Sequence, residues 1–474
     1  MQRIFRVLGF AAIGLMVSVG LASADTINVD TTEDTLNDTS NCSLRDAVRT
    51  ANELIQFGNC EDPQNIGGPP YTLELVDGTY ELSRTGGEQG NGTHNDLDLL
   101  NEVTIESASG NLEDVVITVD DSAFSGDPPP AGEARAFQAE TTSNATKTFR
   151  NLTIRGFTND GQGGVISSTD DLVLENVVLR NNETELGQGG AVFQQGASIT
   201  VTGSSFVNNV SGGSSGGALF LNGPFSAKVR NSTFLRNHAT VYGGAMGVRT
   251  EPVTLNNVTM VNNSADNGDG GAFADDGSNA AHVIRNSIIA GNRAGGSGPD
   301  CSPGTAASGD YNLIGDSSDC SALTGGDNVT DVEPRLAAPG RYNGQTFMRP
   351  PLTASPAIDA GSCTDTGGAS VTTDQRGRSN TRDVDGDGDA SSACDIGAVE
   401  RQKVAMTVDD TADTSDQDTS DDTCMDNNGN CTLRAAIDEA NHSPDLEEIV
   451  LPEGTVTLSK SGIDEDANAT GDLD

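Results

Sequence analysis

The chain has 474 residues, with 70 acidic against 26 basic side chains, and a formal net charge of −44 at pH 7. A charge this negative keeps a protein soluble and repels nucleic acid and anionic membranes, so we expect no nucleic-acid partner. The chain contains no Trp, and aromatic residues make up 4% of it. Aromatic platforms for stacking on sugar rings are therefore scarce.

The first 24 residues predict a secretory signal peptide. Arg3 and Arg6 precede an apolar run over 7–21, and Ala22, Ser23 and Ala24 supply the small residues of a cleavage site. No other stretch reaches the roughly 18 apolar residues that span a bilayer. We expect a mature chain that starts at residue 25, carries no membrane-spanning segment, and is secreted or held at the bacterial cell surface.

An amphipathic helix is predicted to follow residue 42. Ser43 is a good N-cap, and Asp46 stands three residues on, where a capping box places an acidic or amide side chain. One face of this helix carries the apolar residues Leu44, Val48, Ala51 and Ile55. We expect the helix to cover the open end of the structure that follows it.

The middle of the chain repeats about every 27 residues. Glycine doublets begin at residues 163, 189, 216, 243 and 270, and β-branched and apolar residues alternate between them. Such alternation, interrupted by Gly and Asn, predicts short strands joined by tight turns. A leucine-rich repeat has a similar period, but it needs a leucine-lined second half that these repeats lack. The prediction is an all-β fold, a right-handed parallel β-helix with coils of about 27 residues and a short N-terminal capping helix.

Equivalent residues of successive coils should then form ladders. An inward apolar ladder is expected from Phe206, Phe234, Met260 and Ile289. A second ladder is expected from Asn182, Asn209, Asn237, Asn263 and Asn292, at turns where each amide can bond to the amide of the next coil. We interpret these Asn residues as structural and not as ligand-binding.

Eight Cys residues in an exported chain predict disulfides. Pairing of near neighbours would join Cys42 to Cys60, Cys301 to Cys320, Cys363 to Cys394 and Cys424 to Cys431. Eight cysteines allow 105 pairings, so the sequence leaves the connectivity open.

Several motifs carry a family resemblance. The stretch NCSLRDAV at 41–48, followed by ANE at 51–53, resembles the CSLREA domain that begins exported bacterial β-helix proteins. The stretches DYNLIGD at 310–316, SPAIDAG at 355–361, DQRG at 374–377 and CDIGAVE at 394–400 resemble the choice-of-anchor Q domain. The resemblance implies a pectin-lyase-like fold in a surface or secreted protein. It implies no reaction, because that fold hosts enzymes and inert stalks alike.

The tail restarts the first motif, since CTLRAAI at 431–437 is followed by AN at 440–441. The predicted organisation is therefore a signal peptide (1–24), a CSLREA-type cap with the first coils (25–120), β-helix repeats (121–299), a choice-of-anchor Q-like region (300–402), and the start of a second CSLREA-type module (403–474) that looks truncated. A surface anchor would lie beyond residue 474.

One acidic loop resembles the first half of a calcium-binding loop. Its candidate metal ligands are Asp383, Asp385, Asp387, Asp389 and Asp395. Cys394 stands where a calcium loop has its bidentate Glu. Two interpretations remain open, a solvated acidic loop and a weak structural Ca²⁺ site, and we expect no other cofactor.

No catalytic residue is assigned from the sequence. Arg150, Arg230 and Arg285 share one repeat position, but Glu175, Thr202 and Asn256 fill it in the intervening coils, so no continuous cationic groove for a polyuronate is expected. The strand segments hold almost no Asp for a hydrolase, and no His lies in a G-x-S-x-G context. The sequence favours a non-catalytic adhesive or structural protein with an unknown glycan or protein partner. A polysaccharide lyase or glycoside hydrolase is the alternative.

Overall fold

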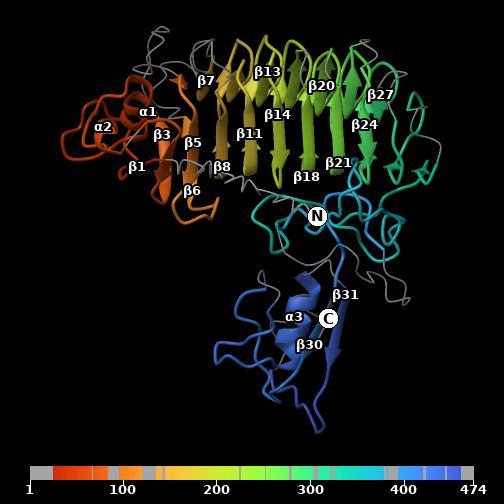
Figure 1. Ribbon diagram of the computed structural model, residues 1–474. Helices are drawn as coiled ribbons and strands as arrows, with labels where there is room; N and C mark the ends of the chain where they lie inside the picture. The colour runs from red at the N-terminus through yellow and green to blue at the C-terminus, as the bar shows by residue number, and fades with distance from the viewer. Residues whose placement is uncertain are drawn as a thin grey trace, which may run out of the picture.

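The computed structural model describes residues 25–66, 68–83, 96–119, 135–140, 145–223, 226–250, 252–276, 280–302, 308–320, 323, 326–377, 382, 393–419, 423–442 and 446–460. The chain winds into a parallel β-helix whose coils stack side by side in sequence order (Figure 1). The fold class is the one that the glycine doublets predict. The predicted signal peptide lies outside the described residues.

Three parallel sheets run along the described part of the stack. The largest, sheet A, takes its main path through β1 (Asp25–Val29), β2 (Tyr71–Leu75), β5 (Val103–Ser107), β8 (Lys147–Arg155), β11 (Leu172–Arg180), β14 (Ile199–Thr202), β18 (Ala227–Leu235), β21 (Val253–Val261), β25 (Ile288–Ala290), β28 (Leu313–Ile314) and β29 (Val329–Thr330). Its side members are β3 (Gly78–Leu82), β6 (Val115–Val119), β15 (Ser205–Val207) and β24 (Val283–Arg285).

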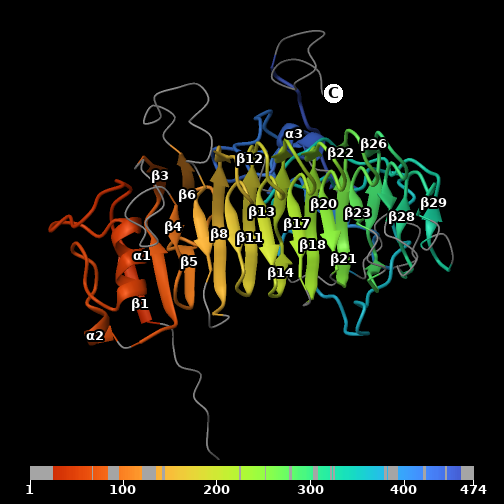
Figure 2. The ribbon, with the colours of Figure 1, turned by 90° about the horizontal axis from the view of Figure 1, so that it is seen from above.

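The other two sheets contribute shorter strands to each coil. Sheet B consists of β4 (Leu97–Asp98), β7 (Phe137–Ala139), β10 (Ile166–Ser168), β13 (Val192–Gln195), β17 (Leu219–Asn222), β20 (Met246–Arg249), β23 (Phe273–Asp275) and β27 (Cys301–Ser302). Sheet C consists of β9 (Thr158–Asn159), β12 (Glu183–Thr184), β16 (Val210–Ser211), β19 (His238–Ala239), β22 (Ser264–Ala265) and β26 (Arg293–Ala294). Figure 2 shows the stack from above.

A residue in the left-handed backbone conformation divides each long strand of sheet A into two limbs. This position is Asn176 in β11 (φ 51°) and Asn231 in β18 (φ 48°), and Gly203 takes it between β14 and β15 (φ 64°). Asn and Gly accept positive φ more readily than other residues, which explains this column of the repeat. We call the residues before this position the first limb and those after it the second limb.

The glycine doublets align because the backbones of adjacent coils almost touch there. A Cβ atom added to Gly190 would lie 2.1 Å from the carbonyl oxygen of Gly217, one coil on. The Gly190 N–H donates to Gly216 O (3.0 Å), and Gly217 N–H donates to Gly243 O (3.1 Å). The doublets are therefore required by close packing between coils.

The predicted inward ladders are present. Phe206 and Phe234 are fully buried, and their rings stack with centroids 4.5 Å apart. Asn209 Nδ2 donates to Asn237 Oδ1 (3.0 Å), and Asn237 Nδ2 donates to Asn263 Oδ1 (3.0 Å). Each of these buried amides has partners in the coils on either side, which confirms the structural interpretation of this Asn column.

The helix α1 (Leu44–Glu53) covers the first coil, and the short helix α2 (Pro63–Ile66) follows it. Ser43 Oγ accepts the N–H of Asp46 (3.1 Å), as expected for the N-cap. The helix is shorter than the sequence pattern predicted, because Leu54 takes a left-handed conformation (φ 57°) and ends it. Ile55 therefore does not lie on the buried face but is 54% exposed.

Residues 333–402 form what we call the return segment, and its described parts (333–377, 382 and 393–402) lie across the second limbs of sheet A. Ser205 Oγ donates to Phe347 O (2.6 Å), and Gly397 N–H donates to Asn286 O (2.8 Å). An apolar layer forms between the two parts from Val207, Leu235, Val261, Ile288, Leu336, Ala357 and Ile396. The second limbs are thus covered, and on the first limbs the return segment reaches only part of the outer face, near β21 and β24.

The tail folds like the N-terminal cap. It consists of β30 (Lys403–Thr407), α3 (Leu433–His442) and β31 (Leu446–Val450), and β30 pairs with β31 in parallel as β1 pairs with β2. Arg434 Nε donates to Asp413 (2.6 Å) with both side chains buried, and Arg45 makes the same bond to Asp34 (2.6 Å). The repeated motif therefore builds a repeated structure.

The structure contains four disulfides, and all are between near neighbours. They are Cys42–Cys60, Cys301–Cys320, Cys363–Cys394 and Cys424–Cys431. The first bridges the cap, the second lies where the stack ends, and the third ties the return segment to itself. The sequence had left this connectivity open.

Candidate functional site

Two columns of side chains face outward from the first limbs of sheet A. Inward positions alternate with them and hold buried residues such as Val201, Val229 and Leu255. The first outward column is Thr26, Thr72, Thr104, Thr148, Val173, Thr200, Lys228, Thr254 and Val283. The second is Asn28, Glu74, Glu106, Arg150, Glu175, Thr202, Arg230, Asn256 and Arg285. This register confirms that other side chains separate the three Arg residues of the column. They are Glu175, Thr202 and Asn256.

Two of these three Arg residues are neutralised by carboxylates. Arg150 bonds to Glu106 (2.8 Å) and to Glu175 (2.7 Å), on the strands either side of it. Burial opposes the charge on Arg150, but the bonds to the two carboxylates outweigh it and raise the pKa of the guanidinium. Arg285 bonds to Asp310 (2.6 Å). The charges of Arg150 and Arg285 are therefore already paired with carboxylates of the protein itself.

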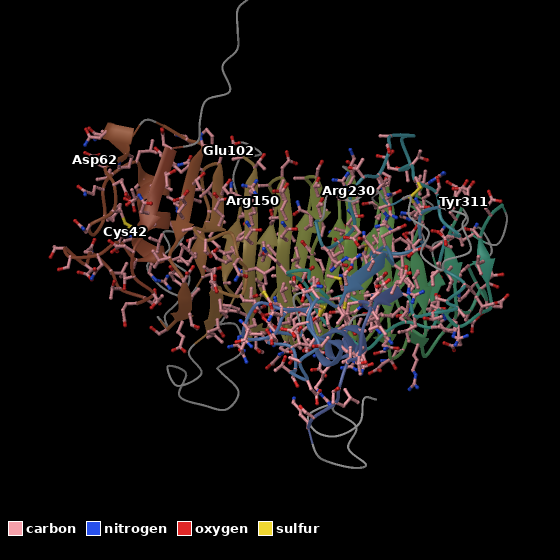
Figure 3. The ribbon with its side chains drawn as sticks, turned by 90° about the horizontal axis from the view of Figure 1, so that it is seen from below. Cys42, Asp62, Glu102, Arg150, Arg230 and Tyr311 are labelled. Carbon is pink, nitrogen blue, oxygen red and sulfur yellow. A yellow bond between two sulfur atoms is a disulfide. The ribbon has the colours of Figure 1, made fainter. Side chains whose placement is uncertain are left out.

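Lys228 and Arg230 differ from the other cations of this face. Both side chains are exposed, and no hydrogen bond or ion pair joins either of them to a described residue. They stand on one strand, β18, two residues apart, so both point away from the core. Figure 3 shows Arg150 and Arg230 along the same face of the stack.

These two cations line a groove of about 390 Å³. Its floor is the first limbs of β14, β18 and β21, and its wall is a loop of the return segment. The lining residues are Thr200, Val201, Thr202, Lys228, Val229, Arg230, Thr254, Asn256, Asp365, Thr366 and Gly367. The groove thus combines hydroxyl groups, one amide, two cations and one carboxylate at its wall.

Asn256 holds a buried acceptor without a partner in this groove. The residue is 4% exposed, and its Oδ1 atom has no hydrogen-bond partner among the residues that the structure describes. The orientation of the amide is fixed by its neighbour, because Asn257 Nδ2 donates to Gly397 O (3.4 Å) and leaves Asn257 Oδ1 to accept from Asn256 Nδ2. A buried polar atom left without a hydrogen bond is costly, and a ligand that donates to it would remove that cost.

A second constellation lies on sheet C. His238 Nδ1 is 2.9 Å from Ser264 Oγ, and His238 Nε2 is 3.4 Å from the carboxylate of Asp266. Ser264 and Asp266 line a cavity of about 620 Å³ together with Arg236 and Arg293. This group was not predicted from the sequence, although residues 238 and 264 are one repeat step apart and adjacent coils bring them together.

The surroundings of this constellation do not suit acyl transfer. The backbone N–H groups of Ser264, Asp266 and Arg293 donate to carbonyls of the preceding coil at 2.9, 3.0 and 2.9 Å. They are therefore not free to form an oxyanion hole. The His238 side chain is 31% exposed and that of Asp266 is 59% exposed, so water surrounds the group. Acyl transfer of this kind depends on a low-dielectric environment, and this exposed group lacks one.

Of the predicted calcium ligands, Asp383, Asp385, Asp387 and Asp389 lie outside the described residues. Asp395 is fully buried, and its two oxygens accept the N–H groups of Asp359 (2.8 Å) and Arg401 (2.6 Å). Burial raises the pKa of Asp395 to about 7. Within the described ranges, no three His, Cys, Asp or Glu side chains are grouped to hold a metal ion. The calcium site stays a prediction.

Comparison with known proteins supports the fold. A family model described as a right-handed beta helix region matches residues 135–299. This match and the stacked sheets define the class, a right-handed parallel β-helix protein. No curated protein and no solved structure gives a significant match. In the part of the chain that the structure describes, no helix is both long and apolar enough to cross a bilayer.

Proposed function

We propose that this protein is a non-catalytic β-helix that is exported and presents a binding surface outside the bacterial cell, in adhesion or attachment to the envelope. The observation that carries this proposal is the composition of the strand-face groove. Its lining offers hydroxyls, an amide and cations, which bind a polar ligand. A glycoside hydrolase needs two carboxyl groups across the bond it cleaves, and the described lining includes only Asp365.

The disulfides support the proposed location. Four bridges in one chain suit an oxidising compartment, because the cytosol keeps thiols reduced. The signal peptide is tested by expressing the whole chain in a bacterium. We expect the protein outside the cytoplasm, with Asp25 as its first residue by N-terminal sequencing. A chain retained in the cytoplasm with residues 1–24 intact would contradict export.

A polysaccharide lyase is the second candidate. Lys228 and Arg230 favour it, because neither side chain has a partner among the described residues and a lyase uses a basic side chain to remove a proton next to a uronate carboxyl group. The test is incubation of the secreted protein with pectate, alginate and neutral glycans, with and without Ca²⁺. We expect neither new reducing ends nor the absorbance of an unsaturated product. If either signal appears and is lost in the Lys228→Gln and Arg230→Gln variants, the groove is catalytic and the proposed non-catalytic function is wrong.

A further inference from the structure

We propose that the groove over β14, β18 and β21 binds an acidic saccharide in which one charged unit lies between two neutral ones. This inference rests on the proposed binding function and adds the chemistry of the partner. It follows from three properties of the groove: where its charge lies, which atoms lack partners, and how far it extends.

The positive charge of the groove is confined to its central coil. Lys228 and Arg230 both stand on β18, and their neighbours in register are Thr200 and Thr202 on β14. On the other side, β21 places the neutral residues Thr254 and Asn256 beside them. A carboxylate or sulfate over β18 would receive two charge-assisted hydrogen bonds.

The neutral coils suit hydroxyl and amide groups of a ligand. Threonine hydroxyls both donate and accept, so they match a sugar hydroxyl in either sense. Asn256 Oδ1 has no hydrogen-bond partner among the described residues and is closed to solvent, so an O–H or N–H group of the ligand satisfies it once the groups that cover it move aside. Asp365 at the wall offers further acceptor atoms. A purely anionic ligand without donors would leave these acceptors unsatisfied.

The groove is short because charge pairs end it on both sides. The coil before β14 presents Glu175, which is bonded to Arg150 and would repel a further anion. The coil after β21 presents Arg285, whose guanidinium donates to Ser362 Oγ (2.9 Å) and to Asp310. Three coils at about 4.8 Å spacing give a site about 10 Å long. A chain of consecutive uronates would place a charge over a neutral coil or near Glu175.

The experiment compares three trisaccharides by titration calorimetry with the whole mature protein. The mixed trimer is N-acetylglucosamine–glucuronate–N-acetylglucosamine. The others are the neutral N-acetylglucosamine trimer and trigalacturonate, which carries three adjacent carboxylates. We expect the mixed trimer to bind at least about tenfold more tightly than either, a difference of about 1.4 kcal/mol that a single charge-assisted hydrogen bond can supply. A neutral trimer or trigalacturonate that binds equally well would overturn the proposal.

Variants assign the binding to this groove. Lys228→Gln and Arg230→Gln should each weaken the mixed trimer about tenfold, and Asn256→Leu should weaken both N-acetylglucosamine-containing trimers. Arg293→Gln, an exposed cation on sheet C, is the matched control and should bind as the unaltered chain does. Thermal unfolding of every variant shows whether it folds. Unchanged binding in both folded cation variants would exclude the groove.

The same samples separate this inference from the proposed function. If the mixed trimer is cleaved, the non-catalytic function fails, whichever trimer binds best. If no trimer binds and none is cleaved, the saccharide inference fails, and the presentation of some other ligand remains the function.

Discussion

At the residue scale, asparagine has two separate tasks in the coils. Asn176, Asn231 and their equivalents take positive φ and bend the chain between the two limbs of sheet A. Asn209, Asn237 and their equivalents are buried and link one coil to the next through their amides. One task depends on backbone conformation and the other on hydrogen bonds, so the two columns should respond differently to the same substitution.

Replacement of a buried amide should be costly. Asn237→Ala leaves the N–H of Asn209 and the carbonyl of Phe206 without their partner in the interior. We expect a loss of about 2–4 kcal/mol in the free energy of unfolding, measured by denaturant titration. Asn267→Ala, at an exposed turn with one hydrogen bond, is the control and should cost less than about 1 kcal/mol. Equal losses would show that the ladder contributes no special stability.

The loss of stability on replacing Asn176 or its equivalents should depend on how well the new residue accepts positive φ. Asn176→Gly keeps the left-handed conformation accessible, as Gly203 does one coil on, and should change the unfolding free energy by less than about 1 kcal/mol. Asn176→Val forces a β-branched residue into positive φ and should cost about 1–3 kcal/mol. If both variants unfold at the same denaturant concentration, conformation does not explain this column.

At the element scale, the repeated strands were predictable and the return segment was not. A fixed step between glycine doublets specifies which residues meet in successive coils. The Phe and Asn ladders could therefore be located from the sequence alone. Residues 333–402 carry no repeat, and nothing in their sequence indicates that they cross sheet A. The groove could not be predicted for that reason, since Asp365 and Thr366 form its wall. His238 and Ser264 belong to no local sequence motif, and only the step of 26 residues between them indicates that they meet in adjacent coils.

Asp395 should make the return segment more stable at acid than at neutral pH. Its pKa is raised by burial to about 7 in the folded chain, against about 4 for an exposed carboxyl group. The folded state therefore holds a proton that the unfolded state has lost between about pH 4 and 7. The free energy of unfolding should fall as pH rises through this range. Denaturant titrations at pH 5 and pH 7.5 measure the effect.

Asp395→Asn should remove the part of this pH dependence that Asp395 contributes, because an amide does not titrate. Burial also raises the pKa of Glu400, which lies beside Asp395, so a smaller dependence of the same sign should remain. Glu333→Gln changes an exposed carboxylate of the same segment and should leave the dependence unchanged. Stability that rises from pH 5 to 7.5 would contradict the assignment to Asp395.

At the scale of the whole molecule, the β-helix depends on the return segment to cover its second limbs. Without residues 333–402, an apolar row would face water, formed by Val207, Leu235, Val261 and Ile288. A chain that stops after residue 332 should bind a hydrophobic dye, aggregate, and unfold at a lower temperature. A chain that stops after residue 402 keeps the covered face and should unfold like the whole protein. Dye binding by both chains would place the exposed apolar surface elsewhere.

The path of the return segment also has a mechanical consequence. It contacts the stack near Glu113, through Arg341, and again near Asn286, through Gly397, so it runs lengthwise while the strands run crosswise. Traction between neighbouring coils would have to peel them apart one ladder at a time. Because the return segment is bonded to the stack at both places, it would carry part of any force that is applied along the axis of the stack.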